Sequence, residues 1–139
     1  SWQYLLSTCL SQNNTLLIEL PDSLGCLSFI IKRHNKENVT NVTSAQDHQL
    51  RPPAGDQRIS IGFTHQNPKC LPGFRQRSRN LKKVLQELNI APWQRKRIPF
   101  IFYDHIFVAA VGYFVCKEYE AIEGDLSVAI SLDKTISDD

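Results

Sequence analysis

The chain has 139 residues, of which 42% are hydrophobic and 22% charged, and its formal net charge is +2. This length and balance predict one compact domain with a buried core, and they exclude a chain that is disordered throughout. No apolar run reaches the ~20 residues of a membrane helix, and no Cys-x-x-Cys pair suggests zinc or redox chemistry, so we expect a cytoplasmic protein with reduced cysteines.

The first residues predict a short amphipathic helix. Apolar side chains recur there at one-turn spacing, at Trp2, Leu5, Leu6, Cys9 and Leu10. Because the chain begins at Ser1 and holds no methionine, we expect it to be a piece of a longer or processed chain. Residues 1–14 are then a helix or linker leading in from a preceding domain, residues 15–133 are the domain, and residues 134–139 are a tail.

Short apolar runs bounded by turn residues predict strands in the first half of the chain. The runs 15–20 and 24–31 favour β structure, and the turn signal Pro21-Asp22-Ser23 between them predicts a strand pair. Residues 32–49 are polar and predict a loop or a weak hairpin. From Arg58 to Phe63 large apolar residues alternate with small or polar ones, which predicts a half-buried strand.

The clearest helical pattern follows in the middle of the chain. Four apolar side chains at i, i+3, i+4 and i+7 fall within about 100° of arc; they are Leu81, Val84, Leu85 and Leu88. Ser78 is the expected N-cap, Asn89 is able to adopt the left-handed conformation that ends a helix, and Pro92 prevents continuation. One face of this helix is predicted to join the core, and the other to be presented to a partner.

Strand-like runs return after Pro99. Residues 100–103 and 106–116 are apolar, and Asp104-His105 between them predicts a tight turn. Residues 126–132 alternate again. Several short strands around one strong helix predict a β-rich α+β domain.

Charge is distributed unevenly along the chain. Residues 69–103 hold nine basic side chains and one acidic one, Glu87, whereas residues 1–68 hold five of each and residues 104–139 hold two basic and eight acidic ones. A concentrated positive patch most often has a polyanion as its partner, and a solvated helix face is the alternative interpretation.

Three motifs follow one another in the basic region. The basic helix of residues 79–88 precedes Ile90-Ala91-Pro92-Trp93-Gln94-Arg95, and the apolar run Ile98-Pro99-Phe100-Ile101-Phe102-Tyr103 comes next. In this order they resemble the C-terminal domain of the tRNA(Ile)-lysidine synthetase family. Weaker likeness at residues 20–25, 50–53, 59–63 and 108–115 extends the resemblance to most of the chain.

The resemblance implies a fragment of a larger ligase. Enzymes of that family use ATP to adenylate C2 of a wobble cytidine in an isoleucine tRNA, and lysine then displaces AMP to form lysidine. Their phosphate loop, Ser-Gly-Gly-x-Asp-Ser, belongs to an N-terminal catalytic domain, whereas the six glycines of this chain are isolated. We therefore expect no catalytic residue, metal or cofactor in this fragment, and ATP and lysine to be used by the parent enzyme.

The resemblance also implies a fold and a set of partners. The family's C-terminal domain is similar to a domain of the phenylalanyl-tRNA synthetase β subunit, which implies sandwich-like packing of the short strands beside one main amphipathic helix. That domain grips the tRNA acceptor stem. The expected partners are the acceptor stem of an isoleucine tRNA and the missing N-terminal catalytic domain, and no membrane.

Candidate RNA-binding residues come from both sides of the predicted helix. Double-stranded RNA is held mainly through charge and shape. Arginines suit paired phosphate oxygens, and the helix N-terminus adds positive partial charge and free N–H donors. The predicted contact residues are Arg75, Arg77, Arg79, Lys82, Lys83, Gln86, Trp93, Arg95, Lys96 and Arg97. Trp93 is able to stack on a terminal base, although a tryptophan between a proline and a buried hairpin is more often core, and the same caution applies to Tyr103.

Two other functions compete with RNA binding. The basic helix face and the acidic C-terminal third could pair between two molecules, which predicts a protein-interaction module or a homodimer. An independent enzyme would need a nucleophile set such as Asp104, His105 and Cys116, but a turn acid, a turn histidine and a thiol in an apolar strand are far more often structural. The histidines share no spacing with cysteines or carboxylates that suggests a metal site.

Overall fold

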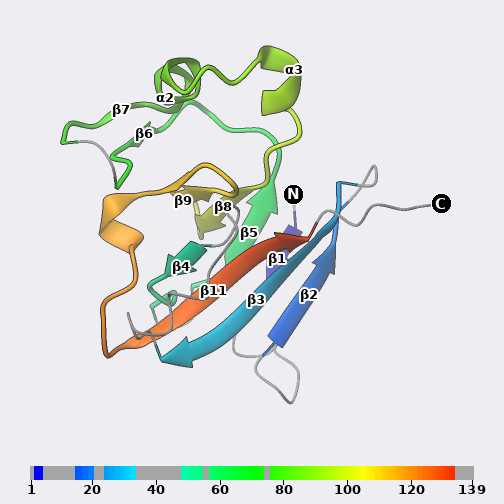
Figure 1. Cartoon of the computed structure of the whole chain (residues 1–139), viewed down its shortest axis with the longest axis vertical. Helices are drawn as coiled ribbons and strands as arrows, with labels where there is room; N and C mark the ends of the chain where they lie inside the picture. The colour runs from blue at the N-terminus through cyan, green and yellow to red at the C-terminus, as the bar shows by residue number, and fades with distance from the viewer. Residues whose placement is uncertain are drawn as a thin grey trace.

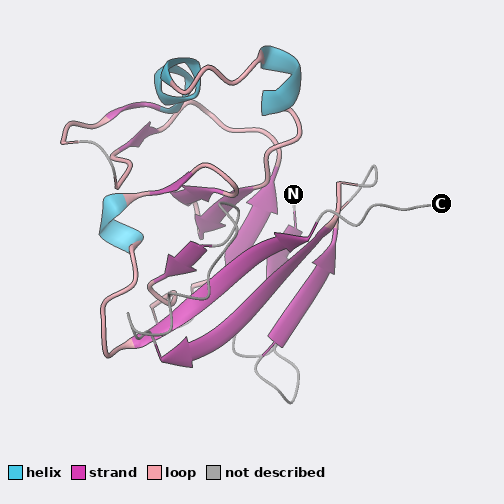
Figure 2. Ribbon diagram, viewed as in Figure 1, coloured by secondary structure: helices cyan, strands magenta, loops and turns pink. Residues whose placement is uncertain are grey.

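The computed structural model describes residues 2–4, 15–20, 24–33, 48–54, 57–73 and 76–133. In this part of the chain, strands form two larger antiparallel sheets and a two-stranded ribbon, and two short helices lie together at one end (Figure 1, Figure 2). The five-stranded sheet has the order β1 (Trp2–Tyr4), β5 (Ile59–Gly62), β8 (Phe100–Tyr103), β9 (Ile106–Ala110) and β10 (Phe114–Val115). The four-stranded sheet has the order β2 (Thr15–Glu19), β3 (Cys26–Arg33), β11 (Leu126–Asp133) and β4 (His48–Leu50).

The two larger sheets pack face to face and enclose the main core. Leu27 and Phe29 of β3 belong to the same buried cluster as Ile59 and Ile61 of β5. Apolar residues at alternate positions put one side of each strand into this cluster, because successive side chains of a strand point to opposite faces. The predicted β-rich sandwich is confirmed, as are the strand pair at residues 15–31 and the strand at residues 126–132.

Tyr103 of β8 is a core residue, as expected. Its side chain is fully buried, and its hydroxyl donates a hydrogen bond to the carbonyl of Arg51 at 2.6 Å. Burial, and to a lesser extent Tyr119, raise the pKa of this phenol, so the hydroxyl keeps its proton. The phenol therefore joins the loop after β4 to the five-stranded sheet.

A second core lies on the outer face of the five-stranded sheet. The elements that cover it are the ribbon of β6 (Lys69–Cys70) and β7 (Arg79–Asn80), then α2 (Leu81–Glu87) and α3 (Pro92–Arg95). Leu81, Val84 and Leu85 of α2 are buried in one cluster with Phe100 and Phe107 of the sheet. The sheet is thus covered by the second sheet on one face and by α2 on the other.

Four expectations about local structure need correction. The helix expected from residue 2 is wrong at Trp2–Tyr4, which form β1 and pair with β5; the rest of that helix lies outside the described residues. Strand β5 is buried on both faces, not one. Ser78 is not the helix N-cap, because α2 begins after Asn80. The loop or weak hairpin expected over residues 32–49 is wrong at its two ends, because Lys32 and Arg33 belong to β3 and His48 and Gln49 to β4; residues 34–47 lie outside the described part.

The hairpin of β8 and β9 and the described thiols agree with expectation, but the strand-like run expected over residues 106–116 is two strands, because the chain turns at residues 111–113 and β10 pairs back on β9. Strands β8 and β9 pair through a turn at Asp104, which has a φ of 55°. Cys26, Cys70 and Cys116 are free thiols, whereas Cys9 lies outside the described residues. Across the described ranges, no helix has the length and apolar character needed to span a bilayer.

Candidate nucleic-acid interface

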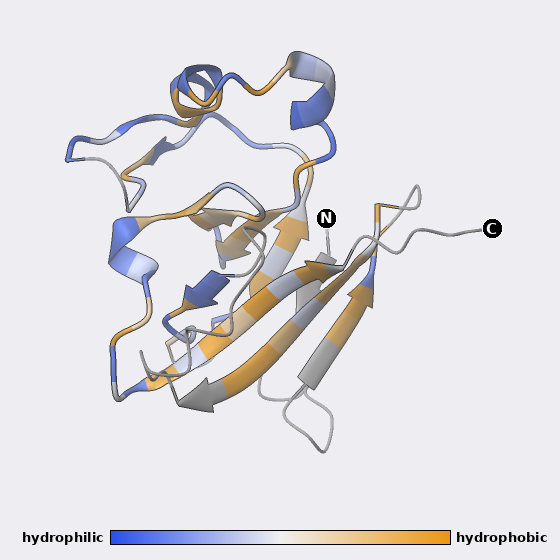
Figure 3. Cartoon of the chain, viewed as in Figure 1, coloured by the Kyte–Doolittle hydropathy of each residue, from blue (hydrophilic) through white to orange (hydrophobic). Residues whose placement is uncertain are grey.

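The basic part of the chain forms a separate layer, which we call the basic cap: the described residues 69–73 and 76–97. It contains β6, β7, α2 and α3, which lie at the same end of the molecule (Figure 1). Figure 3 shows hydrophilic residues along α3 and on part of α2, whereas the long strands of the sandwich carry many hydrophobic residues. The exposed basic side chains of the cap are Lys69, Arg77, Arg79, Lys82, Lys83, Lys96 and Arg97.

Helix α2 separates packing residues from presented residues, as its pattern predicts. Its apolar stripe is buried against the sheet, while Lys82, Lys83 and Gln86 are exposed. A helix repeats every 3.6 residues, so a stripe at three- and four-residue spacing leaves the opposite side to solvent. Three of the predicted contact residues therefore share one free face.

The start of α2 is held by the loop that precedes β6. The carbonyl of Pro68 accepts a hydrogen bond from the N–H of Leu81 at 2.8 Å, and the side-chain oxygen of Asn67 accepts one from the N–H of Lys82 at 2.8 Å. The first backbone donors of a helix have no partner within the helix, and here two of them are used internally. The expectation of free N–H donors for phosphate at this end is therefore wrong for these two groups.

The end of α2 is closed by its own backbone. Asn89 has a φ of 60°, and its N–H donates to the carbonyl of Gln86, while the N–H of Ile90 donates to the carbonyl of Leu85. This pair of hydrogen bonds is a Schellman motif, which needs a residue in the left-handed region. The predicted role of Asn89 is confirmed.

Helix α3 begins with Pro92 and is tied back to the end of α2. The Arg95 Nε donates a hydrogen bond to the carbonyl of Ile90 at 2.8 Å, and Arg95 is only partly exposed. The side chain of Gln94 accepts from the N–H of Ala91, which closes the first turn of α3. Arg95 therefore links α3 to the end of α2. Only the guanidinium N–H groups other than that of Nε remain available to a ligand.

Trp93 stands on the surface of α3. Its side chain is 72% exposed, and no residue of α3 is buried. The core alternative for Trp93 is wrong, because a four-residue helix held at its ends leaves its second residue outside the packed layer. Lys96 and Arg97, which follow α3, are also exposed, so an aromatic face and two cations occur together along this edge of the cap.

The single acidic residue of the cap is paired. The Arg79 Nε lies 3.6 Å from a carboxylate oxygen of Glu87, and the Arg79 side chain is 45% exposed. This pair offsets one positive charge and restrains Arg79. Arg75, the first of the predicted contact residues, lies outside the described residues.

The acidic segment around the 3-10 helix η3 (Lys117–Tyr119) adjoins one end of the basic cap, because the N–H of Lys117 donates to the carbonyl of Leu71 at 2.7 Å and the Glu120 carboxylate lies beside Gly73. Glu118 belongs to η3, the orange segment in Figure 1, and Glu120 and Asp125 follow it. The main chain of this segment is held by Arg51, whose Nε donates to the carbonyl of Glu120 at 3.2 Å. The tail of residues 134–139 lies outside the described part.

The structure does not assemble the alternative catalytic set. Asp104 accepts a hydrogen bond from the N–H of Arg58 at 3.0 Å at the exposed hairpin turn. Cys116 is buried beside Cys70, and the hydrogen bond with Cys70 and burial raise the pKa of its thiol. A buried, protonated thiol is a poor nucleophile. Among the residues that the structure describes, no group of three or more His, Cys, Asp or Glu side chains is arranged to hold a metal ion.

Sequence reasoning missed Asn67 and Lys69. The Asn67-Pro68 pair signals a loop, but the hydrogen bond from the N–H of Lys82 to the Asn67 side chain joins residues fifteen positions apart. Lys69 is exposed on β6, opposite Asn80 of β7. Only the pairing of the ribbon shows that it belongs to the same layer as α2.

Comparisons with known proteins agree on one family. A family model described as "TilS substrate C-terminal domain" matches residues 59–132. A tRNA(Ile)-lysidine synthase of Photorhabdus laumondii is 37% identical over 135 residues, which cover 97% of this chain and 27% of that protein. A tRNA(Ile)-lysidine synthase of Serratia proteamaculans is 41% identical over 105 residues, which cover 76% of this chain and 21% of that protein.

A solved structure supports the same fold. The crystal structure of a TilS C-terminal domain superposes with a TM-score of 0.66 at 12% sequence identity, covering 88% of this chain and 99% of that one. The chain spans only about a quarter of the length of the curated relatives described above.

Proposed function

The chain belongs to the TilS substrate C-terminal domain family, and on this premise we propose that it is the tRNA-binding end of a tRNA(Ile)-lysidine synthase and grips the acceptor stem of an isoleucine tRNA. The parent enzyme then uses ATP and lysine to convert the wobble cytidine to lysidine. Catalysis belongs to the N-terminal domain that is missing from this chain. The contribution of this domain is affinity and the choice of tRNA.

The observation that carries the proposal is the exposed face of the basic cap. Lys82 and Lys83 on α2 and Lys96 and Arg97 after α3 are all exposed in one layer. An A-form acceptor stem presents phosphates along the rims of a narrow groove, so a protein contacts it mainly through cations and shape. Lysine supplies a mobile point charge and arginine a planar fork, and the cap offers both.

The hydrogen bonds within the cap indicate which cations are free for phosphate. Arg79 faces Glu87, and Arg95 holds the carbonyl of Ile90, so their share in binding is smaller than their charge suggests. About five phosphate contacts from the other cations would give a log-log salt slope of roughly −3.5 to −4.5, at ~0.7 to 0.9 per contact. Gln86 and Trp93 add a polar and a stacking contact.

The size of the domain limits what it can hold. A single domain of this length has a radius of gyration of about 14 Å, whereas the acceptor end and the anticodon lie at opposite tips of an L-shaped tRNA. The domain therefore serves the reaction at a distance, because binding energy gained on the acceptor stem helps to position the wobble base in the other domain.

The test is a binding titration of this chain with an isoleucine tRNA, its isolated acceptor minihelix and its anticodon stem-loop, each followed by fluorescence anisotropy. We expect the full tRNA and the minihelix to bind alike and the anticodon stem-loop more weakly, with the steep salt dependence given above. Heparin of matched charge serves as the competitor for non-specific binding. Equal binding of all three RNAs, or affinity insensitive to salt, would contradict acceptor-stem recognition.

The remaining partner predictions are tested beside it. Size-exclusion chromatography of the free chain distinguishes a monomer from the predicted homodimer, which the family assignment does not favour. Co-purification with the N-terminal domain of the parent protein tests the predicted docking. The likeness to a domain of the phenylalanyl-tRNA synthetase β subunit stays a prediction that superposition of the two folds would test.

A further inference from the structure

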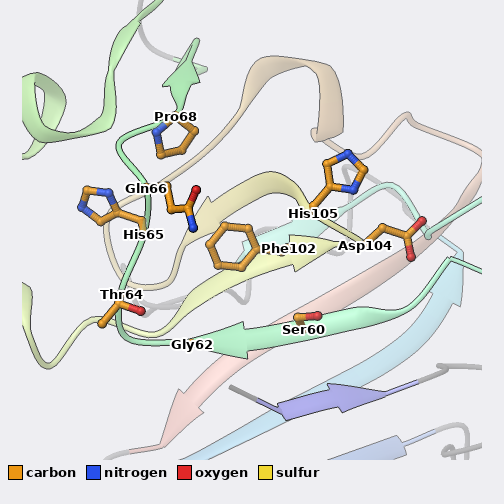
Figure 4. Close-up of a pocket in the computed structure, with 9 residues that line it drawn as sticks. All are labelled: Ser60, Gly62, Thr64, His65, Gln66, Pro68, Phe102, Asp104 and His105. Carbon is orange, nitrogen blue, oxygen red and sulfur yellow. The ribbon is translucent and has the colours of Figure 1, made fainter.

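A pocket opens on the outer face of the five-stranded sheet next to the basic cap (Figure 4). Ser60 and Gly62 of β5 line it, while Ile59 and Ile61 point into the main core. Phe102 of β8 is the cross-strand partner of Ser60, so the two side chains share the outer face. The ring of Phe102 beside the small residues Ser60 and Gly62 leaves a hollow of about 380 Å³, which is in the range of small-ligand sites.

The ring of Phe102 is fixed within this pocket. It packs edge-to-face against Phe107 with ring centroids 5.8 Å apart, and the Phe102 side chain remains partly exposed. Figure 4 shows the ring at the centre of the lining residues. A fixed and partly exposed ring is a surface on which a planar group can stack.

Polar residues line the pocket near that ring, although the His65 ring itself packs edge-to-face against Phe100, with centroids 5.3 Å apart. The Nδ1 of His65 accepts the N–H of Asn67 at 2.8 Å, which leaves the proton of the neutral ring on Nε2 as a donor. Burial, with the charge of Lys82, lowers the pKa of His65, so the ring is uncharged at neutral pH. Ser60 is 94% buried, and its hydroxyl, which has no hydrogen-bond partner within the described structure, lies beneath the pocket floor and not on its surface. Gln66 adds an exposed amide to the lining.

The pocket and the basic cap share one wall. Pro68 lines the pocket, and its carbonyl accepts the N–H of Leu81, while the neighbouring Asn67 holds the N–H of Lys82. Lys69 follows Pro68 and is exposed. At the other end of the pocket lies the carboxylate of Asp104. No lysine lines the pocket itself, but Lys82 of the cap is close enough to act on the lining residue His65, whereas Asp104 and His105 line the end at the hairpin turn.

We propose that this pocket binds one unpaired nucleotide of the RNA held by the basic cap, with its base against Phe102 and its phosphate toward Lys69 and Lys82. This inference rests on the proposed function. Unpaired bases of RNA are typically recognised by aromatic stacking combined with hydrogen bonds to their edges, and the lining supplies both. The Asp104 carboxylate disfavours a phosphate at the far end, which fixes the direction of the bound nucleotide.

The experiment compares two RNA hairpins that differ in one feature. One is blunt, and the other carries the same stem with a single-stranded 3′ adenosine extension. Each is titrated into the chain and into three variants. F102L removes the aromatic face but keeps apolar bulk, Q66A removes an exposed polar contact, and F63L is the matched control, since Phe63 is also partly buried but packs against the main core. Adenosine monophosphate is titrated separately as the free nucleotide.

We expect the wild-type chain and F63L to bind the extended hairpin about tenfold more tightly than the blunt one, from the stacking of one base. F102L and Q66A should lose much of that preference and bind the blunt hairpin as the wild type does. Adenosine monophosphate alone should bind far more weakly than the extended hairpin.

Three results would overturn the inference in distinguishable ways. If the wild-type chain binds both hairpins equally, the pocket holds no nucleotide of the RNA, but the proposed function stands. If adenosine monophosphate binds as tightly as the extended hairpin, the pocket serves a free nucleotide instead. If neither hairpin binds, the proposed function fails as well.

Discussion

The sandwich and the basic cap use their side chains in opposite ways. The sandwich encloses a core between two sheets, and most of its large residues are fully buried, among them Leu27, Phe29 and Tyr103. The cap buries one stripe of α2 against the outer sheet face and exposes nearly all of its charge. The sandwich therefore supplies most of the stability and the cap most of the binding. A substitution of an exposed cap residue should leave stability largely unchanged, and a tolerated substitution in the sandwich should leave binding largely unchanged.

Not every cation of the cap is free for binding. Arg95 satisfies a backbone carbonyl at the end of α2, and Arg79 is restrained by Glu87. Asn67, although uncharged, positions the whole layer by holding the start of α2. The residues of the molecule therefore fall into three groups: those of the buried core, those that hold the cap in shape, and the exposed cations of the cap.

The largest loss of stability is expected from a substitution in the core of the sandwich. Phe29→Ala removes a fully buried ring between the two sheets and should lower the free energy of unfolding by about 3–5 kcal/mol. Urea denaturation measures this loss. The control is Leu17→Ala on the neighbouring strand β2, where the side chain is 65% exposed and the expected change is within about 0.5 kcal/mol. A similar loss in both variants would show that the core is not where the structure puts it.

The next largest loss of stability is expected from substitutions of Asn67, the residue that holds the start of α2. Asn67 has a φ of 53° and accepts the N–H of Lys82. Asn67→Gly removes the acceptor but tolerates this φ, and should cost about 1 kcal/mol. Asn67→Ala keeps the Cβ that asparagine already has in the left-handed region, but it loses the polar side chain that makes this φ tolerable, so it should cost more than Asn67→Gly, about 2 kcal/mol in all.

Asn67→Asp is the matched control for this position. It keeps an acceptor and places a negative charge at the N-terminus of a helix, so stability should be unchanged or slightly higher. The order Asp, Gly, Ala in falling free energy of unfolding is the expected result. Equal losses for Asp and Gly would contradict the hydrogen bond to α2.

The cations of α2 should affect binding without affecting stability. Replacing Lys82 and Lys83 together by alanine removes two exposed charges and should weaken tRNA binding about tenfold and reduce the magnitude of the salt slope by roughly 1.4–1.8. The free energy of unfolding should change by no more than about 0.5 kcal/mol. Lys117→Ala is the control, because Lys117 is an exposed lysine on η3 outside the cap. An equal loss of affinity in this control would mean that binding follows net charge and not the cap.

Much of the fold could be predicted because it depends on local patterns. Residues close together in the sequence determine three features that the structure confirms: the apolar stripe of α2, the helix end at Asn89 and the strand at residues 126–132. The helix expected at Trp2–Tyr4 is wrong because a short apolar segment fits the period of a helix as well as that of a strand. Pairing with β5 makes this segment a strand.

The candidate site was less predictable, because its geometry depends on contacts between distant residues. The sequence shows that Arg79 and Arg95 are basic, but not that one meets Glu87 and the other a carbonyl of the main chain. Likewise, the hollow beside Phe102 arises from its pairing with Ser60, on a strand far away in sequence. Charge can be counted from sequence, whereas the availability of each charge requires the packed structure.

The smallest effects on stability and on binding are expected from a substitution of Trp93, an exposed aromatic residue of the cap. This tryptophan is 72% exposed in the cap, so Trp93→Ala should leave the free energy of unfolding within about 0.5 kcal/mol of the wild type. If Trp93 stacks on a base, the same change should weaken tRNA binding about threefold to fivefold, near the lower end of base–aromatic stacking. Trp93→Phe keeps an aromatic face and should retain most of the affinity. An Ala variant that binds as the wild type does, while the paired lysine variant does not, would restrict the interface to the α2 side of the cap.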